Sequence, residues 1–284
     1  MKVAILGATG MLGSMVHRYL SQQPGYNLSV STRYVLDAEN TTVTLLSNLL
    51  RGHDYAINCI GIIKPRIDEL DPISVKRAIQ VNSLFPHLLA KAAEATNCKV
   101  IQIATDCVYS GYDGPYDEFE PGDATDVYGK TKSLGEVRSP NVCHLRCSII
   151  GPEIKNHRSL LDWFLSKPQE AQVNGYRNHR WNGVTTLAFA RICHGVMLSN
   201  WDFVLQPPKH VVPKNSVTKA ELLGHIAYFY NRQDIRLNEI DALTTVDRTL
   251  STLNEDGNLE FWQAAGYDEP PYIQQMIEEL AAYQ

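Results

Sequence analysis

Tyr128 and Lys132 have the residue types and the spacing of a proton-donating pair. They lie four residues apart in a segment, Tyr128 to Val137, for which the sequence predicts a helix. Residues at this spacing share one helix face. A free phenol has a pKa near ~10, and a neighbouring ammonium favours the phenolate and lowers that pKa. We therefore expect Tyr128 to act as an acid whose pKa Lys132 lowers. The alternative is an exposed helix pair without chemistry.

The first residues of the chain have the order strand, glycine turn, helix. An apolar run from Val3 to Leu6 precedes three glycines spaced three residues apart, and a helix is predicted from Met11 to Ser21. Such glycines permit a tight turn and let the backbone approach a pyrophosphate, to which the helix N-terminus offers free N–H groups. We predict a dinucleotide site; the alternative is a glycine turn without a ligand. The expected contacts are Gly7, Thr9, Gly10, Met11, Leu12 and Gly13.

Strand-like and helix-like segments alternate through the first half of the chain. This order favours a parallel sheet with helices on both faces. The sequence therefore predicts an α/β protein with a Rossmann-type doubly wound parallel sheet and a smaller α/β substrate lobe. The expected strands are Val3–Leu6, Leu28–Val30, Tyr55–Ile60, Val100–Ile103 and Val142–Leu145, and the expected helices are Met11–Ser21, Val43–Leu50, Pro72–Ala95 and Tyr128–Val137.

The alternating pattern loosens near Gly151. Residues 1–150 are expected to form a dinucleotide-binding domain, and residues 151–284 a substrate-binding lobe. A helix from Thr185 to Leu198 and a strand from Lys209 to Val212 predict that the chain returns to the main sheet at about 184–212.

The two motifs, in this order, resemble the extended short-chain dehydrogenase/reductase family, and within it the branch similar to dTDP-4-dehydrorhamnose reductases. The resemblance covers nearly the whole chain. It implies NADP as the cofactor, with NAD as the alternative, a nucleotide-linked sugar as the substrate, and a homodimer, the form that relatives often take. The stretches that carry it are Gly7–Gly13, Ile57–Gly61, Val81-Asn82, Ala104–Gly111, Gly114–Glu118, Tyr128–Lys132, Leu145–Gly151 and Trp181–Thr186.

The resemblance also implies a catalytic triad of Thr105, Tyr128 and Lys132. Relatives more often have Ser-Thr-Asp where this chain has Ala-Thr-Asp, so the role of the hydroxyl falls to Thr105. Thr105 would polarise a sugar ketone. Tyr128 would donate a proton to the ketone oxygen as the nicotinamide delivers hydride. Lys132 would also hold the nicotinamide ribose. Asn82 matches a residue that continues the proton relay through water, or it is a helix-surface asparagine. Asp106 holds the substrate or caps a turn.

The second predicted strand ends in Ser31-Thr-Arg33, where an NAD site usually has an acidic residue. Hydroxyls and a guanidinium suit a 2′-phosphate, so Arg33 predicts NADP. The alternative is that Arg33 is solvated and that a later carboxylate, Asp37 or Glu39, reads the ribose. In relatives Asp37 matches a residue near the adenine.

Further residues are expected around the cofactor and the substrate. Asn58 and Gly61 would leave room beside the cofactor phosphates and ribose, although Asn58 could instead stabilise the strand end. Arg180, Trp181 and Asn182 fall where relatives meet the nucleotide of the substrate. An indole can stack on a base and a guanidinium can bind a diphosphate; packing of Trp181 in the core is the competing view. Arg146 lies near the active site or pairs with a structural carboxylate, and Asp247-Arg248 could reach the same pocket.

Composition narrows the class of protein. The chain has 284 residues, 44% hydrophobic and 20% charged, with a net charge of −5, which argues against a nucleic-acid partner. No basic and apolar leader and no membrane-length apolar run is evident, so we expect a cytoplasmic protein without a membrane partner. The six cysteines lack C-x-x-C pairs and are expected to be free thiols. No metal site is expected.

Three functions remain open at this point. The first is NADPH-dependent reduction of the 4-keto group of a nucleotide-linked deoxy sugar, dTDP- or UDP-linked, in polysaccharide precursor synthesis. The second is a nucleotide-sugar epimerase that retains its cofactor. A dehydratase is disfavoured because Cys107, not an acid, follows Asp106. The third is a non-catalytic regulatory subunit of reductase-like build, such as that of methionine adenosyltransferase.

Overall fold

A six-stranded sheet forms the centre of the molecule, and every neighbouring pair of strands in it is parallel. The computed structural model describes residues 1–154, 157–199 and 208–283. From one edge to the other, the strands are β10 (Lys209–His210), β5 (Val142–Arg146), β4 (Lys99–Ala104), β3 (Tyr55–Asn58), β1 (Lys2–Leu6) and β2 (Asn27–Ser31).

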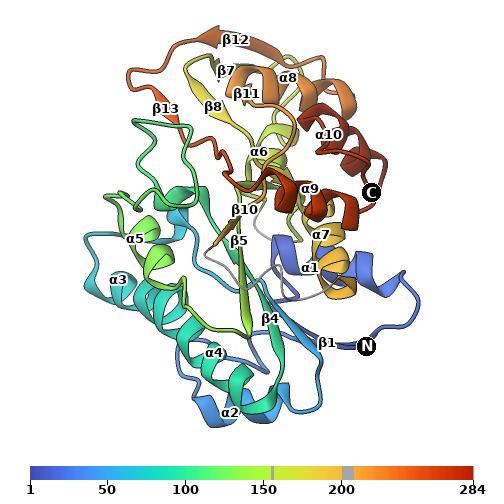
Figure 1. Cartoon of the computed structure of the whole chain (residues 1–284). Helices are drawn as coiled ribbons and strands as arrows, with labels where there is room; N and C mark the ends of the chain where they lie inside the picture. Colours follow the sequence, from blue (N-terminus) through green and yellow to red (C-terminus); the bar gives the residue numbers. More distant parts are fainter. Residues whose placement is uncertain (155–156, 200–207, 284) are drawn as a thin grey trace.

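Helices cover both faces of this sheet (Figure 1). One face carries α2 (Val43–Leu50), α3 (Pro72–Ala78), α4 (Phe85–Thr96) and α5 (Val127–Leu134), and the other carries α1 (Met11–Ser21), α7 (Thr186–Leu198) and α9 (Glu255–Ala264).

The alternation of side chains along β1 explains this arrangement. Val3 and Ile5 belong to the apolar cluster that includes α1 and α7, whereas Ala4 and Leu6 belong to the cluster that includes α2 and α4. A strand whose residues are buried on both faces is typical of a parallel sheet between two helix layers. The predicted doubly wound α/β fold is therefore confirmed.

The long helix expected from Pro72 to Ala95 is interrupted. Between α3 and α4 the chain forms a π-helical turn, η2 (Ile79–Leu84), which the helical pattern of the sequence did not reveal. Such turns shift the register of side chains and are frequent at functional sites. The helix expected to reach Val137 ends earlier, because Gly135 is its C-terminal cap. The other expected helices of the first half begin and end where the sequence places them, and its expected strands all form.

The second half of the chain builds a smaller lobe above the carboxyl edge of the sheet (Figure 1). Its strands form one three-stranded sheet, in the order β11-β8-β13, and small pairs. The elements are β6 (Ile149–Ile150), α6 (Leu160–Leu165), β7 (Gln172–Tyr176), β8 (His179–Trp181), β9 (Val184–Thr185), β11 (Val217–Thr218), α8 (Lys219–Phe229), β12 (Arg236–Ile240), β13 (Val246–Asp247) and α10 (Ile273–Ala282).

Helix α7 and strand β10 lie with the main sheet, although they follow the start of the lobe. β10 pairs with β5, and α7 packs beside α1. Part of the return expected at 184–212, residues 200–207, lies outside the described residues. The division of the chain at residue 150 into two domains stays a prediction.

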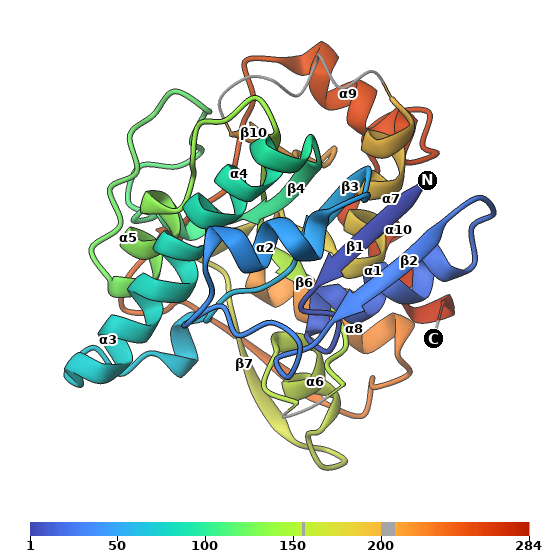
Figure 2. The same cartoon turned by 90° about the horizontal axis from the view of Figure 1, so that it is seen from below.

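One apolar cluster joins the sheet to the lobe. It contains residues of β1 and α1, nearly the whole length of α7, and the inner faces of α8 and α10. Arg18 of α1 also donates a hydrogen bond to the carbonyl of Tyr283, just after α10. The ends of the chain are both marked toward the right of Figure 2, N at the start of β1 and C beyond α10. Within the described ranges, no helix has the length and apolarity needed to cross a membrane.

Candidate active site

Thr105 stands at the carboxyl end of β4, where ligands bind in open parallel sheets. A short 3₁₀ turn, η3 (Asp106–Val108), follows it, and the Thr105 hydroxyl caps this turn by accepting a hydrogen bond from the Cys107 amide at 3.2 Å. The same hydroxyl donates to the Asp106 carboxylate at 3.2 Å. Both side chains are buried. Asp106 therefore does help to hold the turn, one of the two roles expected for it.

Helix α5 packs directly against this turn because Gly129 has no side chain. A Cβ at Gly129 would collide with the Cys107 carbonyl oxygen. Asp126 begins the helix by accepting a hydrogen bond from the Gly129 amide at 2.8 Å, which satisfies one of the free N–H groups of the first turn. The sequence Tyr-Gly at 128–129 thereby places the tyrosine beside Thr105.

The Thr105 side chain lies near enough to the Tyr128 phenol to act on it, and this interaction lowers the pKa of Tyr128. Burial raises the pKa of the Tyr128 phenol above its ordinary value of 10.0, with Cys107 and the buried Asp106 adding to the effect. The phenol is therefore protonated throughout the physiological pH range. This is the state that a proton donor needs before reaction.

Lys132 lies on α5, four residues after Tyr128, and its ammonium donates a hydrogen bond to the Ile103 carbonyl of β4 at 2.9 Å. Burial lowers the pKa of Lys132 to about 8. Desolvation of the phenol is the largest influence on the pKa of Tyr128 in this structure, and it raises that pKa. The expectation that Lys132 lowers the pKa of Tyr128 stays a prediction. Thr105, Tyr128 and Lys132 are nonetheless brought together at one edge of the sheet.

Asn82 connects helix α5 to the loop after β3. Its side-chain oxygen accepts a hydrogen bond from the Ile62 amide at 2.8 Å, and its nitrogen donates to the Ile62 carbonyl at 2.9 Å and to the Thr131 hydroxyl at 3.2 Å. Asn82 is only 2% exposed, so the helix-surface alternative is wrong. Its side chain is a structural clamp, which the π-helical turn η2 makes possible.

The glycine turn has the shape that its sequence predicted. Gly7 has a φ of 82°, a left-handed conformation that favours glycine. A Cβ on Gly13 would collide with the carbonyl of Gly7, so α1 can begin this close to β1 only with glycine at this position. The first turn of α1 therefore presents backbone N–H groups at the carboxyl end of β1, which is where a pyrophosphate fits.

A cleft of about 410 Å³ runs from this turn along the ends of β1, β2 and β3. Many of the residues predicted to contact a cofactor line it. Asn58 does not: it is fully buried, donates to Gln102 at 2.7 Å and accepts from the Ile60 amide at 3.0 Å, and so stabilises the strand end. The cleft is lined by Gly7, Thr9, Gly10, Thr32, Arg33, Leu36, Asp37, Ala38, Glu39, Cys59, Ile60, Gly61, Ile62, Arg66, Arg77 and Val81.

Charged side chains gather at the mouth of this cleft. Glu39 accepts hydrogen bonds from Arg33 at 2.9 Å and from Arg77 at 2.8 Å. Asp37, which also lines the cleft, accepts hydrogen bonds from the Glu39 amide at 3.1 Å and from the Asn40 side chain at 2.8 Å. Arg66 and Arg77 were missed in the sequence because they follow a different strand from Arg33, with no spacing that links them to it.

The lobe residues expected to read a nucleotide are engaged within the lobe. Trp181 is 5% exposed and donates from its indole nitrogen to the Ser148 hydroxyl at 2.9 Å, so it is a core residue and not an open stacking surface. Asn182 is buried and exchanges two hydrogen bonds with the backbone of Leu250, at 2.7 and 2.9 Å. Only Arg180 is substantially exposed, with 48% of its side chain accessible.

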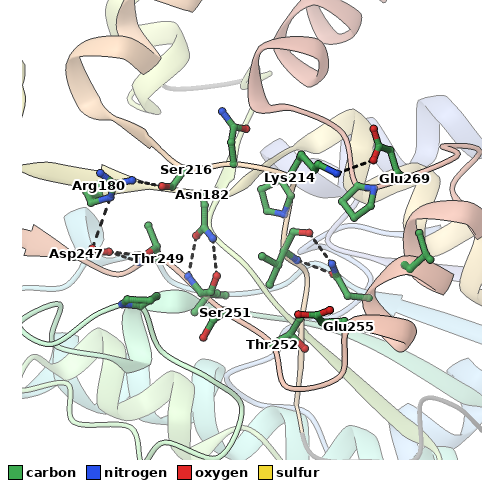
Figure 3. Close-up of a pocket in the computed structure, with 18 of the residues that line it drawn as sticks. Arg180, Asn182, Lys214, Ser216, Asp247, Thr249, Ser251, Thr252, Glu255 and Glu269 are labelled. Carbon is green, nitrogen blue, oxygen red and sulfur yellow. Dashed lines mark hydrogen bonds and ion pairs between the residues drawn. The ribbon is translucent and has the colours of Figure 1, made fainter.

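Arg180 and Asn182 face a second cleft, of about 830 Å³, within the lobe (Figure 3). In that cleft Arg180 donates to Ser216 and lies 3.8 Å from Asp247, and Lys214 forms an ion pair with Glu269 at 2.7 Å. Glu255 and Asp256 add further negative charge to the lining. The cations of this cleft are thus paired, and its acids outnumber them.

Arg146 has a structural role. Its guanidinium pairs with Glu136 at 2.6 Å and also contacts the Tyr109 hydroxyl at 2.7 Å and the ring nitrogen of His210 at 2.8 Å. The side chain is buried, so the alternative of a paired structural arginine is the one that the structure supports.

The part of the chain that forms the glycine turn and the Thr105 group also matches a known protein family. A family model described as the RmlD substrate binding domain matches residues 1–151, which include the glycine turn and the Thr105–Tyr128–Lys132 group. The chain belongs to this family. The RmlD match ends where β6 begins the connection to the lobe.

The curated proteins similar to this RmlD-family chain include both a methionine adenosyltransferase subunit and a reductase. Methionine adenosyltransferase 2 subunit beta of Pongo abelii is 30% identical over 141 residues, 48% of this chain and 41% of that protein. A dTDP-4-dehydrorhamnose reductase of Mycolicibacterium smegmatis is 29% identical over 137 residues, 48% of this chain and 40% of that protein. The matched stretches span about two fifths of the length of these relatives.

A likeness of structure extends over the whole chain. The dTDP-4-dehydrorhamnose reductase of Bacillus anthracis, solved in complex with NADP, matches with a TM-score of 0.80 at 17% identity, covering 100% of this chain and 99% of that one. At this identity the likeness shows the fold, and it confirms the Rossmann-like α/β architecture of the RmlD-family chain.

Proposed function

We propose that this protein uses NADPH to reduce the 4-keto group of a nucleotide-linked deoxy sugar, dTDP- or UDP-linked, in the synthesis of polysaccharide precursors. One observation carries the proposal: Thr105, Tyr128 and Lys132 gather at the carboxyl end of β4, where Gly129 packs on the turn after Thr105 and Lys132 binds the Ile103 carbonyl, and the glycine turn lies along the same edge of the sheet. The reductase named among the relatives supports the substrate class.

The side chains divide the work of the reduction. When bound, the nicotinamide supplies the hydride that adds to the ketone carbon. Thr105 donates a hydrogen bond to the ketone oxygen and so draws electron density from the carbonyl. Tyr128 donates its proton to that oxygen as the negative charge develops. Lys132 holds the nicotinamide ribose and keeps a positive charge beneath the phenol. Asp106 fixes the turn that orients Thr105.

The cofactor cleft fits NADP through its backbone and its arginines. The glycine turn leaves room for a pyrophosphate, since added Cβ atoms there would meet backbone or side chains. Arg33 and Arg77 both point at Glu39, and a 2′-phosphate that displaced this carboxylate would gain two charge-assisted partners. NAD remains the alternative, with Glu39 accepting a hydrogen bond from the ribose 2′-OH.

A second function is favoured by one specific comparison. The similarity to methionine adenosyltransferase 2 subunit beta is as high as that to the reductase. The chain would then bind a dinucleotide and a partner protein without turning over a sugar. The intact Thr105, Tyr128 and Lys132 group supports the reductase over this alternative.

The decisive experiment follows NADPH consumption with purified protein. dTDP- and UDP-linked 4-keto-6-deoxy sugars should each be offered, with the free keto sugar as the control. We expect oxidation of NADPH with at least one nucleotide-linked sugar, much less with the free sugar, and a product heavier by two hydrogens. A protein that binds NADPH but reduces none of them would support the regulatory subunit. Tightly retained oxidised cofactor, with interconversion of two sugars and no net NADPH loss, would indicate an epimerase.

A further inference from the structure

Lys219 begins helix α8 in the lobe, next to the strand that carries Trp181. Thr218 pairs with Arg180 across β11 and β8, which brings the start of α8 over the indole, and the Lys219 ammonium lies 5.7 Å from the centre of the Trp181 ring. Among the described residues, the ammonium has no hydrogen bond or ion pair. Burial lowers the pKa of Lys219. Asp106 and Cys107, in the turn η3 on which Gly129 of α5 packs, act electrostatically on Lys219 and oppose this effect by raising its pKa.

Arg248 approaches the same turn from a different element. It follows β13, and its Nε donates to the Tyr109 carbonyl at 2.9 Å, immediately after η3. Its stem packs on Gly111, where a Cβ would lie 2.9 Å from the Arg248 Cγ. The two terminal nitrogens of the guanidinium make no hydrogen bond within the described part of the chain. The charge of Arg248 acts on Asp106, as does that of Lys219.

Around the turn η3, positive charges outnumber negative ones. Asp106 is a buried carboxylate on which the charges of both cations act to lower its pKa, although burial raises that pKa more. The buried Lys132 adds a third positive charge on the sheet side of the turn. Two cations with open donors that act on one buried acid are suited to binding an anion near the proposed proton donor. The opposite holds in the lobe cleft of Figure 3, where Arg180 and Lys214 are paired with acids.

We propose that Lys219 and Arg248, and not Arg180, bind a phosphate of the nucleoside diphosphate part of the substrate. This inference rests on the proposed function, since it assumes a nucleotide-linked sugar. It assigns the lobe's role in recognition to two residues that lie beyond the RmlD match and are contributed by α8 and the segment after β13. The sugar ring would then lie between this phosphate and Tyr128.

The test is equilibrium binding, which is independent of turnover. Isothermal titration of NADPH-bound protein should compare dTDP, UDP and the nucleosides thymidine and uridine. Lys219→Met keeps the length of the stem over Trp181 and removes the charge. It should weaken binding of the preferred nucleoside diphosphate about tenfold or more, on the scale of a charged hydrogen bond, and leave the nucleoside unaffected. Lys219→Arg should restore most of the loss. Arg180→Met is the matched control and should change the affinity less than about twofold, as for an exposed, paired charge.

Each outcome decides the point. Loss of nucleoside diphosphate binding in Arg180→Met, with Lys219→Met unaffected, would overturn the assignment and leave the proposed function intact. A Lys219→Met variant that loses affinity for a UDP-linked uronic acid but not for UDP would show that the site reads a sugar carboxylate, and would also overturn it. Wild-type protein that binds NADPH but neither dTDP nor UDP would refute the nucleotide-sugar function itself. Arg248→Lys, which keeps the charge, should lose less affinity than Lys219→Met.

Discussion

The cofactor cleft and the lobe cleft use charge in different ways. In the cofactor cleft the glycine turn presents backbone N–H groups, and two arginines, Arg33 and Arg77, share one acid, Glu39. In the lobe cleft the cations Arg180 and Lys214 are neutralised by acids. The cofactor cleft therefore has backbone N–H groups and positive charge available for a ligand, whereas the polar groups of the lobe cleft bind one another and hold the lobe together. Basic residues in a cleft are therefore evidence for binding an anion when they outnumber the acids that pair with them, as Arg33 and Arg77 outnumber Glu39.

The largest expected effect concerns the site between the two clefts. Tyr128→Phe removes one hydroxyl and should reduce turnover by roughly 10²–10⁴, the usual contribution of a general acid. Cofactor affinity should stay unchanged, because the phenol lies at the reacting centre. The control is Tyr112→Phe, the same chemical change at a tyrosine that is 72% exposed. Steady-state rates on a verified substrate decide: a Tyr128→Phe variant that keeps half of the wild-type rate would remove Tyr128 from the mechanism.

The next effect tests whether the close backbone packing of the glycine turn is needed for the cofactor site. Gly13→Ala would force a Cβ into the Gly7 carbonyl, and should lower the free energy of unfolding by about 1–3 kcal/mol, as overpacking does, while weakening NADPH binding. Gly224→Ala in α8 has nothing within 4 Å of the added Cβ. It should raise the free energy of unfolding by about 0.5–1 kcal/mol, since alanine favours a helix. Urea denaturation of both variants measures this, and equal effects would contradict the packing argument.

The smallest effect concerns the arginines at the cofactor cleft. Arg33→Ala should narrow the preference for NADPH over NADH by about 1 kcal/mol, the lower end for a charged hydrogen bond, because the side chain is 71% exposed. Glu39→Gln should widen that preference, since it removes the carboxylate that competes for both arginines. Fluorescence titration with each cofactor gives the affinities, and Arg51→Ala serves as a control at an exposed arginine outside the cleft. If Glu39→Gln instead abolishes NADH binding and leaves NADPH weak, Glu39 reads the ribose.

The sequence predicted the parts of the site that depend on short stretches. The turn from β1 to α1 and the pair Tyr128 and Lys132 are specified by neighbours within a few residues, so their patterns carry the geometry. The pKa of Tyr128 could not be predicted, because burial of the phenol depends on how closely α5 packs on η3. The clamp formed by Asn82 likewise depends on a π-helical turn that helical periodicity does not reveal.

Prediction was poorest in the lobe. Arg180 and Trp181 have residue types suited to a nucleotide, but their availability depends on Asp247 and Ser148, which are distant in sequence. Lys219 and Arg248 belong to short segments without any motif. Only the pairing of β11, β8 and β13 brings those segments to the turn after β4. Residue type indicated the chemistry, and tertiary pairing decided which residues are free to perform it.

The apolar cluster shared by the sheet and the lobe has a consequence for how such proteins can be recombined. The family match ends at residue 151, yet α1 packs against α7, which comes later in the chain. A fragment cut at 151 would expose the face of α1 that carries Met15 and Val16, and would remove β10 from the sheet edge. The lobe therefore cannot be replaced by another lobe through a junction at residue 151. A chimaera with another lobe would have to inherit α7 and β10 together with the sheet, and take only the segments on either side of them from its second parent.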